Sequence, residues 1–256
     1  MKIFRTATLI ALSLLVAAST FDTARAEDKP EADLTMGFYS QYIWRGFAFS
    51  RDSLVIQPSM TVSYKGFGAN LWGNLDTKQW ATDDADKTSN FNETDLTLSY
   101  DGSAGIFGYG AGWILYSVDG AKDSHEFYAS ASLDTILAPS LTIYKETTGL
   151  QGIYAKLAIG HSFELAKDVS LDLGASASYY DNEQSGADSY SELHDGVLSA
   201  SVTLPVAEYV TVSPQLYYSF PLSSKAKDYL KAANSDLIDK AKADYVYGGV
   251  AVSFAF

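Results

Sequence analysis

The segment Tyr247-Gly248-Gly249-Val250-Ala251-Val252-Ser253-Phe254-Ala255-Phe256 closes the chain. In it, valine and phenylalanine alternate with glycine, alanine and serine from Gly249 to Phe256. Because successive side chains of a strand point to opposite faces, the segment predicts a strand with one apolar face and one small or polar face. A strand of this kind suits a wall between hydrocarbon and water.

The same period of two recurs through most of the chain. We count about twelve segments of the length that a tilted strand needs to cross a bilayer, and counts of ten or fourteen also fit the pattern. The segments are residues 33–45, 53–65, 67–76, 93–101, 105–118, 125–134, 140–146, 153–164, 169–180, 197–204, 209–220 and 247–256.

The lengths of the connections distinguish a barrel from a soluble β-sandwich, whose strands also alternate. Every second connection is tight, as at Lys65-Gly66-Phe67, whereas three of the others are long and polar: residues 77–92, 181–195 and 221–244. Short turns on one rim and long loops on the other are typical of outer-membrane barrels, and an even strand count lets the sheet close without an edge. The sequence therefore predicts an all-β protein, a transmembrane antiparallel β-barrel.

The first residues have the pattern of a secretory signal. Lys2 and Arg5 precede an apolar run from Ala7 to Ala18, and Ala24-Arg25-Ala26 provides a small-x-small cleavage site. The apolar run is too short for a permanent membrane helix. We therefore expect residues 1–26 to be a cleaved signal peptide and residues 27–256 to form the barrel.

The composition argues against other classes of protein. The chain has 0 cysteines, so no disulfide framework supports it, and its net charge is −13. Nucleic-acid binding requires basic residues that neutralise phosphates, so no nucleic-acid partner is expected. The 18 tyrosines and 13 phenylalanines are compatible with the aromatic belts of a membrane protein.

The closing strand resembles the C-terminal signature strand of bacterial outer-membrane β-barrels. That resemblance implies that the barrel-assembly machinery recognises Phe256.

A second resemblance lies near the predicted mature N-terminus. The chain carries Ser40-x-Tyr42-Ile43-Trp44-Arg45-Gly46, then Gln57-Pro58, then Gly66-Phe67-x-Ala69-x-Leu71-Trp72-Gly73-Asn74-Leu75-Asp76. These elements resemble those of the TorF-type porins, a proteobacterial outer-membrane family of unsettled function. The match covers the first three strands and continues only as strand pattern and chain length. It implies a pore in the outer membrane of a Gram-negative bacterium, with no assigned substrate.

The phase of the alternation divides the wall into lipid-facing and lumen-facing residues. Polar and aromatic side chains on the inward phase are the candidates for lining a pore. They are Tyr39, Gln41, Arg45, Gln57, Asn70, Asn74, Glu93, Asp95, Glu126, Tyr128, Tyr144, Glu146, Lys156, Asp172, Gln215 and Tyr217.

These residues favour a porin-like channel for passive diffusion of small hydrophilic solutes. Inward carboxylates outnumber Arg45 and Lys156, which predicts a weak preference for cations and disfavours uptake of acidic sugars. The inward tyrosines could offer stacking surfaces for sugars or nucleosides, or they could simply fill a small barrel. We expect outer-membrane lipids and lipopolysaccharide as neighbours, no cofactor, and either a monomer or a trimer.

Arg45 falls on the lumen phase at the outer end of the first predicted strand. A lone charge in a narrow lumen is costly, so its guanidinium needs a carboxylate partner. The inward candidates are Glu93, Asp95, Glu126, Glu146 and Asp172. The pair would either support the wall or contact a solute.

Two alternatives to a channel remain. A lipid-modifying hydrolase would need a Ser/His pair, and His125, His161 and His194 are the only histidines, none of them in a recognisable motif. The other is a closed, non-conducting structural barrel. The acidic run Asp83-Asp84-x-Asp86 lacks the glycine and terminal glutamate of a calcium loop, so no metal site is predicted.

The segment from Lys225 to Lys242 has apolar residues at helical spacing. Ser223 or Ser224 could cap its start. We expect one or two short helices in the last outer loop, lying over the mouth or the lipid headgroups, or folding into the lumen as a plug.

Overall fold

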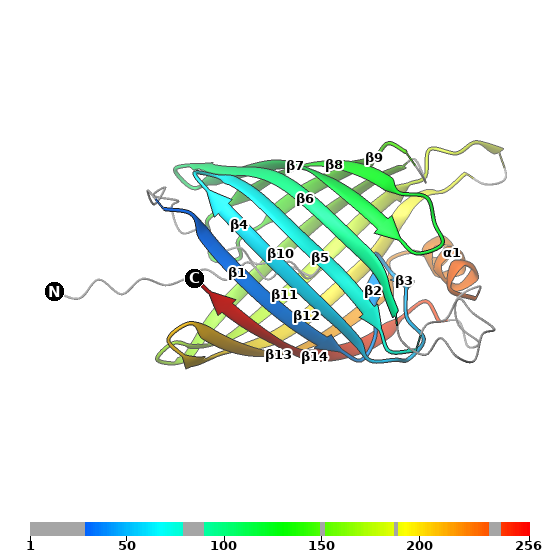
Figure 1. The fold of residues 1–256 in the computed structure, drawn as a ribbon. Coiled ribbons are helices and arrows are strands. Elements are labelled where there is room, and N and C mark those ends of the chain that lie inside the picture. Colours follow the sequence, from blue (N-terminus) through cyan, green and yellow to red (C-terminus); the bar gives the residue numbers. More distant parts are fainter. Residues whose placement is uncertain (1–28, 79–89, 149–151, 187–188, 236–241) are drawn as a thin grey trace.

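The structure is a computed structural model that describes residues 29–78, 90–148, 152–186, 189–235 and 242–256. It is a closed barrel of antiparallel strands, with the two-stranded sheet β2–β3 inside it and the helix α1 at one end (Figure 1). The predicted signal peptide, residues 1–26, and the acidic run Asp83–Asp86 lie outside the described residues.

The predicted fold class and the count of twelve strands are confirmed. The order around the wall is β1-β14-β13-β12-β11-β10-β9-β8-β7-β6-β5-β4, so each strand pairs with its neighbours along the chain. The wall strands are β1 (Glu31–Tyr39), β4 (Val55–Tyr64), β5 (Phe67–Asp76), β6 (Asn90–Ala104), β7 (Phe107–Val118), β8 (Ser124–Leu133), β9 (Ser140–Glu146), β10 (Gly152–Ala166), β11 (Val169–Asp181), β12 (Ser191–Ala207), β13 (Val210–Pro221) and β14 (Tyr245–Ala255).

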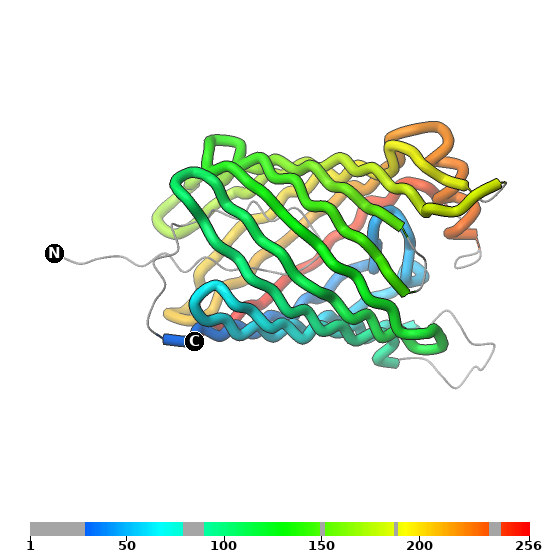
Figure 2. Tube along the Cα trace, turned by 90° about the horizontal axis from the view of Figure 1, so that it is seen from above, coloured from blue at the N-terminus to red at the C-terminus, as the bar shows by residue number. Residues whose placement is uncertain are grey.

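The segment that predicts the fold also closes it. β14 pairs with β1 over a register that runs from Asp33 opposite Ala255 to Tyr39 opposite Gly249. The C-terminus lies at the end of the barrel opposite to α1 (Figures 1 and 2). Closure satisfies the backbone donors and acceptors of both terminal strands, as a membrane requires.

Burial is inverted relative to a soluble protein, because the large apolar side chains are on the outside. Phe67 is 66% exposed and Val246 is 68% exposed, whereas the inward residues Asn74 and Glu126 are 0% and 2% exposed. The outward stripe matches the predicted lipid-facing phase. Among the described residues, no helix is long and apolar enough to cross a membrane.

The short turns on one rim follow their sequence. Lys65 and Gly66 join β4 to β5 with φ values of 51° and 87°. Positive φ at both central residues is the geometry of a type I′ turn, whose twist matches that of the flanking strands.

The first predicted strand, residues 33–45, is wrong at its outer end. β1 stops at Tyr39, and the chain then turns into the barrel as β2 (Ile43–Trp44) and β3 (Phe47–Ala48). Arg45 and Gly46 make the turn between them, with φ values of 51° and 80°. The alternating aromatic residues satisfy a strand pattern in both settings, so periodicity could not separate a wall strand from an internal hairpin.

The predicted helix in the last loop is confirmed as α1 (Ser224–Ser235). The Ser223 hydroxyl accepts a hydrogen bond from the backbone N–H of Ala226 at 3.0 Å, so Ser223 is the N-cap. The helix lies over the mouth of the barrel (Figure 1). The last part of the predicted helical segment, residues 236–241, lies outside the described residues.

The closing seam generates a prediction about stability. A methyl group at Gly249 would overlap the carbonyl oxygen of Phe38 on β1, which is backbone and cannot move without separating the two strands. Gly249→Ala should lower the free energy of unfolding by about 2 kcal/mol. Urea titration in detergent, followed by tryptophan fluorescence, measures this change. Val246→Ala, on the outward face of the same strand, is the control, and equal midpoints for the two variants would contradict the prediction.

Candidate functional site

The candidate site is the segment between β1 and β4, residues 40–54, which we call the inner hairpin. The backbone N–H of Phe49 donates to the carbonyl of Tyr42 at 2.8 Å, and the N–H of Tyr42 donates to the Ser50 hydroxyl at 2.7 Å. Tyr42, Ile43, Ala48 and Ser50 are all buried. A loop in water would leave these residues exposed. Their burial means that the hairpin is packed as a small core within the lumen.

One side of the inner hairpin packs against apolar and aromatic residues of the wall. The rings of Tyr42 and Trp72 lie 5.6 Å apart. The same cluster contains Ile43 and Ala48 from the hairpin together with wall residues from β4, β5, β13 and β14, namely Val55, Trp72, Tyr217, Tyr245 and Tyr247.

The opposite side is fixed by an ion pair between Arg45 and Glu126 of β8. Both terminal nitrogens of the guanidinium donate to the carboxylate, at 2.9 and 2.8 Å. The side chains are only 8% and 2% exposed, so the pair is almost fully removed from water. Tyr116 of β7 donates to the same carboxylate at 2.7 Å, which adds a third charge-assisted hydrogen bond.

Aromatic rings enclose the same guanidinium. Its central carbon lies 4.3 Å from the ring centre of Trp44, 4.7 Å from that of Tyr144 and 4.2 Å from that of Tyr154. Ring faces attract cations, and the effect is larger when water is excluded. Burial alone would lower the pKa of Arg45, but the Glu126 carboxylate together with Tyr116 and Tyr154 outweighs it, and the net pKa is above the ordinary value. The group therefore remains charged.

The backbone of the hairpin tip is held by His194 of β12. Its Nε2 lies 3.1 Å from the carbonyl oxygen of Arg45, and its Nδ1 lies 2.7 Å from the hydroxyl of Tyr190. A carbonyl can only accept, so Nε2 carries the proton; in the neutral imidazole, Nδ1 then accepts from Tyr190.

The helix α1 covers the inner hairpin from outside. Asn234 accepts a hydrogen bond from the N–H of Ala48 at 2.9 Å and donates to the carbonyl of Gly46 at 3.2 Å and to that of Lys242 at 3.0 Å. Leu230 is completely buried and lies against Gly46. The segment that enters the lumen is thus the first loop, and the predicted helix lies on top of it.

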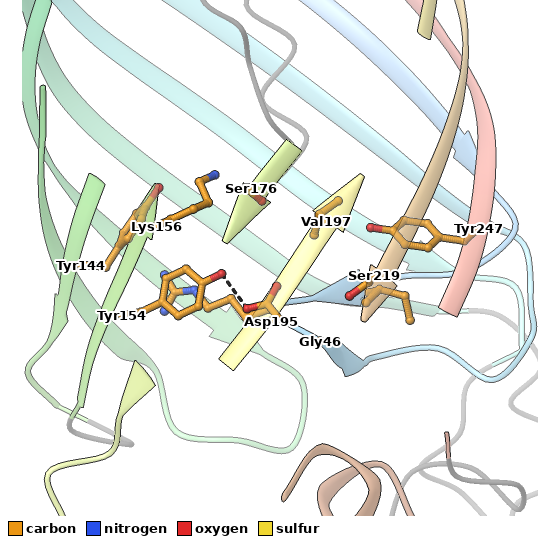
Figure 3. Close-up of a pocket in the computed structure, with 11 residues that line it drawn as sticks. Gly46, Tyr144, Tyr154, Lys156, Ser176, Asp195, Val197, Ser219 and Tyr247 are labelled. Carbon is orange, nitrogen blue, oxygen red and sulfur yellow. Dashed lines mark hydrogen bonds between the residues drawn. The ribbon is translucent and has the colours of Figure 1, made fainter. Parts of the chain in front are cut away.

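A cavity lies beside the hairpin tip and is lined by strands β9 to β14 (Figure 3). Its empty space is about 470 Å³, part of it open to solvent. Tyr154 donates to the Asp195 carboxylate at 2.9 Å, as Figure 3 shows, and the Ser178 hydroxyl donates to the same oxygen at 2.5 Å. Lys156 also lines this cavity.

Most of the predicted lumen residues lie on the inner face of the wall and bond to one another. Gln57 donates to Asn74 at 3.0 Å, Tyr39 and Tyr217 both donate to Gln215, at 2.9 and 2.6 Å, and Asn70 donates to Ser59 at 2.8 Å. Asp172 accepts from Ser170 and Thr203 at 3.0 and 2.9 Å, and the rings of Tyr128 and Tyr144 are 5.7 Å apart. Glu146 lies at the outer end of β9, paired in register with Glu126.

Two predicted wall residues belong instead to the inner hairpin. Gln41 donates to the carbonyl of Ser50 at 3.4 Å, and Arg45 is at the hairpin tip, not on strand one. Both remain inside the barrel. The expectation that Arg45 takes a carboxylate partner is confirmed, and Glu126 is the partner among the candidates. Glu93 instead hydrogen-bonds Tyr42 of the hairpin, with Asp95 close to the same hydroxyl.

Three contributors were not predicted from sequence: Asp195, Asn234 and the contact of His194 with the hairpin. Asp195 and His194 fall in the predicted loop of residues 181–195, whereas β12 begins earlier, at Ser191. Asn234 falls in the predicted helical segment, where the spacing assigns it no contact. Nothing in the local sequence indicates that its side chain binds the backbone of a segment 186 residues earlier.

The ion pair yields a prediction about the docking of the inner hairpin. Glu126→Gln keeps the shape of the side chain but leaves the Arg45 charge buried and unpaired. Removing one partner of a buried pair costs about 3 kcal/mol, so amide exchange in residues 41–53 should be roughly 100-fold faster. Hydrogen–deuterium exchange with mass spectrometry measures this rate. Lys145→Gln, which removes the rim ion pair with Glu183, is the control and should leave the exchange rate unchanged. An unchanged rate in Glu126→Gln would show that the ion pair does not hold the hairpin.

No family model and no curated protein matches the chain. Among solved structures, the KdgM porin matches with a TM-score of 0.54 at 13% sequence identity, covering 88% of this chain and 99% of that one. KdgM in complex with disordered oligogalacturonate matches with a TM-score of 0.52, also at 13% identity. The NanC porin matches with a TM-score of 0.53 at 10% identity, covering 87% of this chain and 98% of that one. The chain has the fold of these outer-membrane porins.

Proposed function

We propose that the protein is an outer-membrane channel for the passive diffusion of small hydrophilic solutes. The observation that carries the proposal is the inward stripe of hydrogen-bonded polar side chains within a wall whose outer face is apolar. A barrel whose interior were meant to stay dry would be filled by apolar residues, as in closed β-cores. Polar lumens are typical of porins.

The proposal includes a weak preference for cations. The charge of Arg45 is balanced by Glu126, which leaves Lys156 as the other inward base. Against it stand the inward carboxylates Asp172 and Asp195, which accept hydrogen bonds from hydroxyl groups. An excess of fixed negative charge raises the local concentration of cations in a pore.

The same electrostatics support neutral or cationic solutes over acidic ones. The KdgM porin, whose fold is similar, was solved in complex with disordered oligogalacturonate, a polymer of acidic sugars. We propose that this lumen, with its excess of carboxylates, favours a different class of solute.

The contacts of the histidines give little support to a lipid-modifying hydrolase. His125 stacks on Trp113 with ring centres 5.5 Å apart, and His161 bonds the carbonyl of Ile136 at 2.7 Å. His194 contacts Tyr190 and a backbone carbonyl. None of these contacts, in the part of the chain that the structure describes, is the Ser/His hydrogen bond that such an enzyme needs.

The same fold supports a proposal about localisation. We propose that the barrel lies in the outer membrane of a Gram-negative bacterium, surrounded by lipid and lipopolysaccharide, after export directed by residues 1–26. The closing strand would be recognised by the barrel-assembly machinery through Phe256, which is 76% exposed at the end of β14.

Planar-bilayer recording tests the channel and its selectivity together. The purified protein should produce conductance steps, and in a KCl gradient the reversal potential should have the sign expected when potassium carries more current than chloride. Asp172→Asn should move that potential towards zero, because it removes an inward charge. Asp134→Asn, the same change at an exposed turn, should leave it alone. Absence of conductance steps would contradict the proposed channel, and anion selectivity would contradict the proposed preference for cations.

Assembly has its own test. Phe256→Ala should reduce the amount of barrel that reaches the outer membrane in its heat-modifiable, folded form. Phe67→Ala removes another exposed aromatic ring without touching the closing strand, and it should assemble normally. Equal amounts of the two folded variants would contradict a role for Phe256 in recognition.

A further inference from the structure

We infer that the inner hairpin is a gate, closed in this structure, and that the ion pair between Arg45 and Glu126 is its latch. The inference rests on the proposed channel function and adds a regulated step to it. The docked hairpin blocks the outer half of the lumen, and its release opens the path.

The contacts of the hairpin place it across the lumen. Tyr42 of the hairpin lies against Trp72 of β5, in one buried cluster with Tyr217 of β13. Its tip contacts Glu126 of β8 and Tyr154 of β10, and its backbone bonds His194 of β12. Contacts with strands on all sides of a closed wall are possible only for a segment that crosses the lumen.

The attachment of the hairpin allows it to leave without opening the wall. Tyr39 and Val55, the residues at its two ends, pair with each other in the register of β1 and β4. The wall is therefore continuous beneath the hairpin, and residues 40–54 form an insertion at a single point of the rim. Undocking this insertion breaks side-chain contacts and leaves the barrel ladder intact.

The docked conformation depends on its contacts. Asp52, which lies outside the two-residue turn of the hairpin, is a non-glycine residue with a φ value of 30°. Such backbone is unfavourable for residues with a Cβ and persists only where surrounding contacts impose it. When those contacts are lost, the backbone can relax to a more favourable conformation.

The latch is concentrated in few polar groups. The Arg45 guanidinium donates twice to Glu126, and its Nε has no hydrogen-bond partner among the residues that the structure describes. On the outer side, Asn234 holds the backbone of Gly46 and Ala48. A buried pair is sensitive to the loss of either charge, so a single substitution should shift the balance between closed and open states.

Single-channel recording of matched variants tests the gate. The wild-type protein should spend most of its time at a low conductance level, with brief visits to a higher one. Arg45→Gln and Glu126→Gln should each raise the ratio of open to closed time by roughly 100-fold. Lys145→Gln, which removes an exposed rim pair, should behave like the wild type.

A second variant makes the test independent of the latch. Residues 41–52 are replaced by a short glycine–serine linker, which preserves the pairing of Tyr39 with Val55. Heat-modifiable migration on gels confirms that each variant folds as a barrel. The linker variant should remain at the high level and show no closures.

Chemical labelling provides a readout other than current. The chain has 0 cysteines, so Ser176→Cys places a single thiol in the cavity next to the hairpin tip. A membrane-impermeant cationic thiol reagent added from the outer side should label it slowly, and faster when Glu126→Gln is also present.

The outcomes separate the gate from the channel. Equal conductance and equal labelling in the wild type, the latch variants and the linker variant would overturn the gate and leave the channel in place. If even the folded linker variant conducts nothing, the channel and the gate both fail.

Discussion

The structure depends on one constraint: a chain in hydrocarbon must satisfy its backbone hydrogen bonds within itself. The pairing of β1 with β14 meets that constraint by removing both edges of the sheet. Once the wall is closed, its outer face needs only apolar surface and its inner face is sheltered from lipid. Polar side chains, an internal hairpin and a buried ion pair can then occupy the interior.

The sheltered interior obeys different rules from the core of a soluble protein. Its packing is apolar on the side of Trp72 and Tyr217 and polar on the side of Glu126. The inner hairpin joins the two sides, and its own aromatic rings contact one another. Apolar packing holds it on the first side, whereas a few directional polar contacts hold it on the second.

Periodicity predicted the wall because lipid on one face and water on the other impose a period of two on every strand. β5 and β9 even match the predicted limits, residues 67–76 and 140–146. Periodicity was wrong at residues 40–45, where the environment is neither lipid nor water. One feature of the candidate site could be predicted from sequence: the charge of Arg45 requires a carboxylate partner. The choice of Glu126 among the inward acids depends on the depth to which the hairpin enters, which local sequence does not encode.

The contacts of Asn234 have a consequence for sequence divergence. Its carboxamide binds three main-chain groups, the N–H of Ala48 and the carbonyls of Gly46 and Lys242. These hydrogen bonds of Asn234 depend on the backbone conformation of the hairpin and do not involve the hairpin side chains. Homologues could exchange the residues that face the solute path and retain the same closure. One scaffold could then accept solutes of different classes.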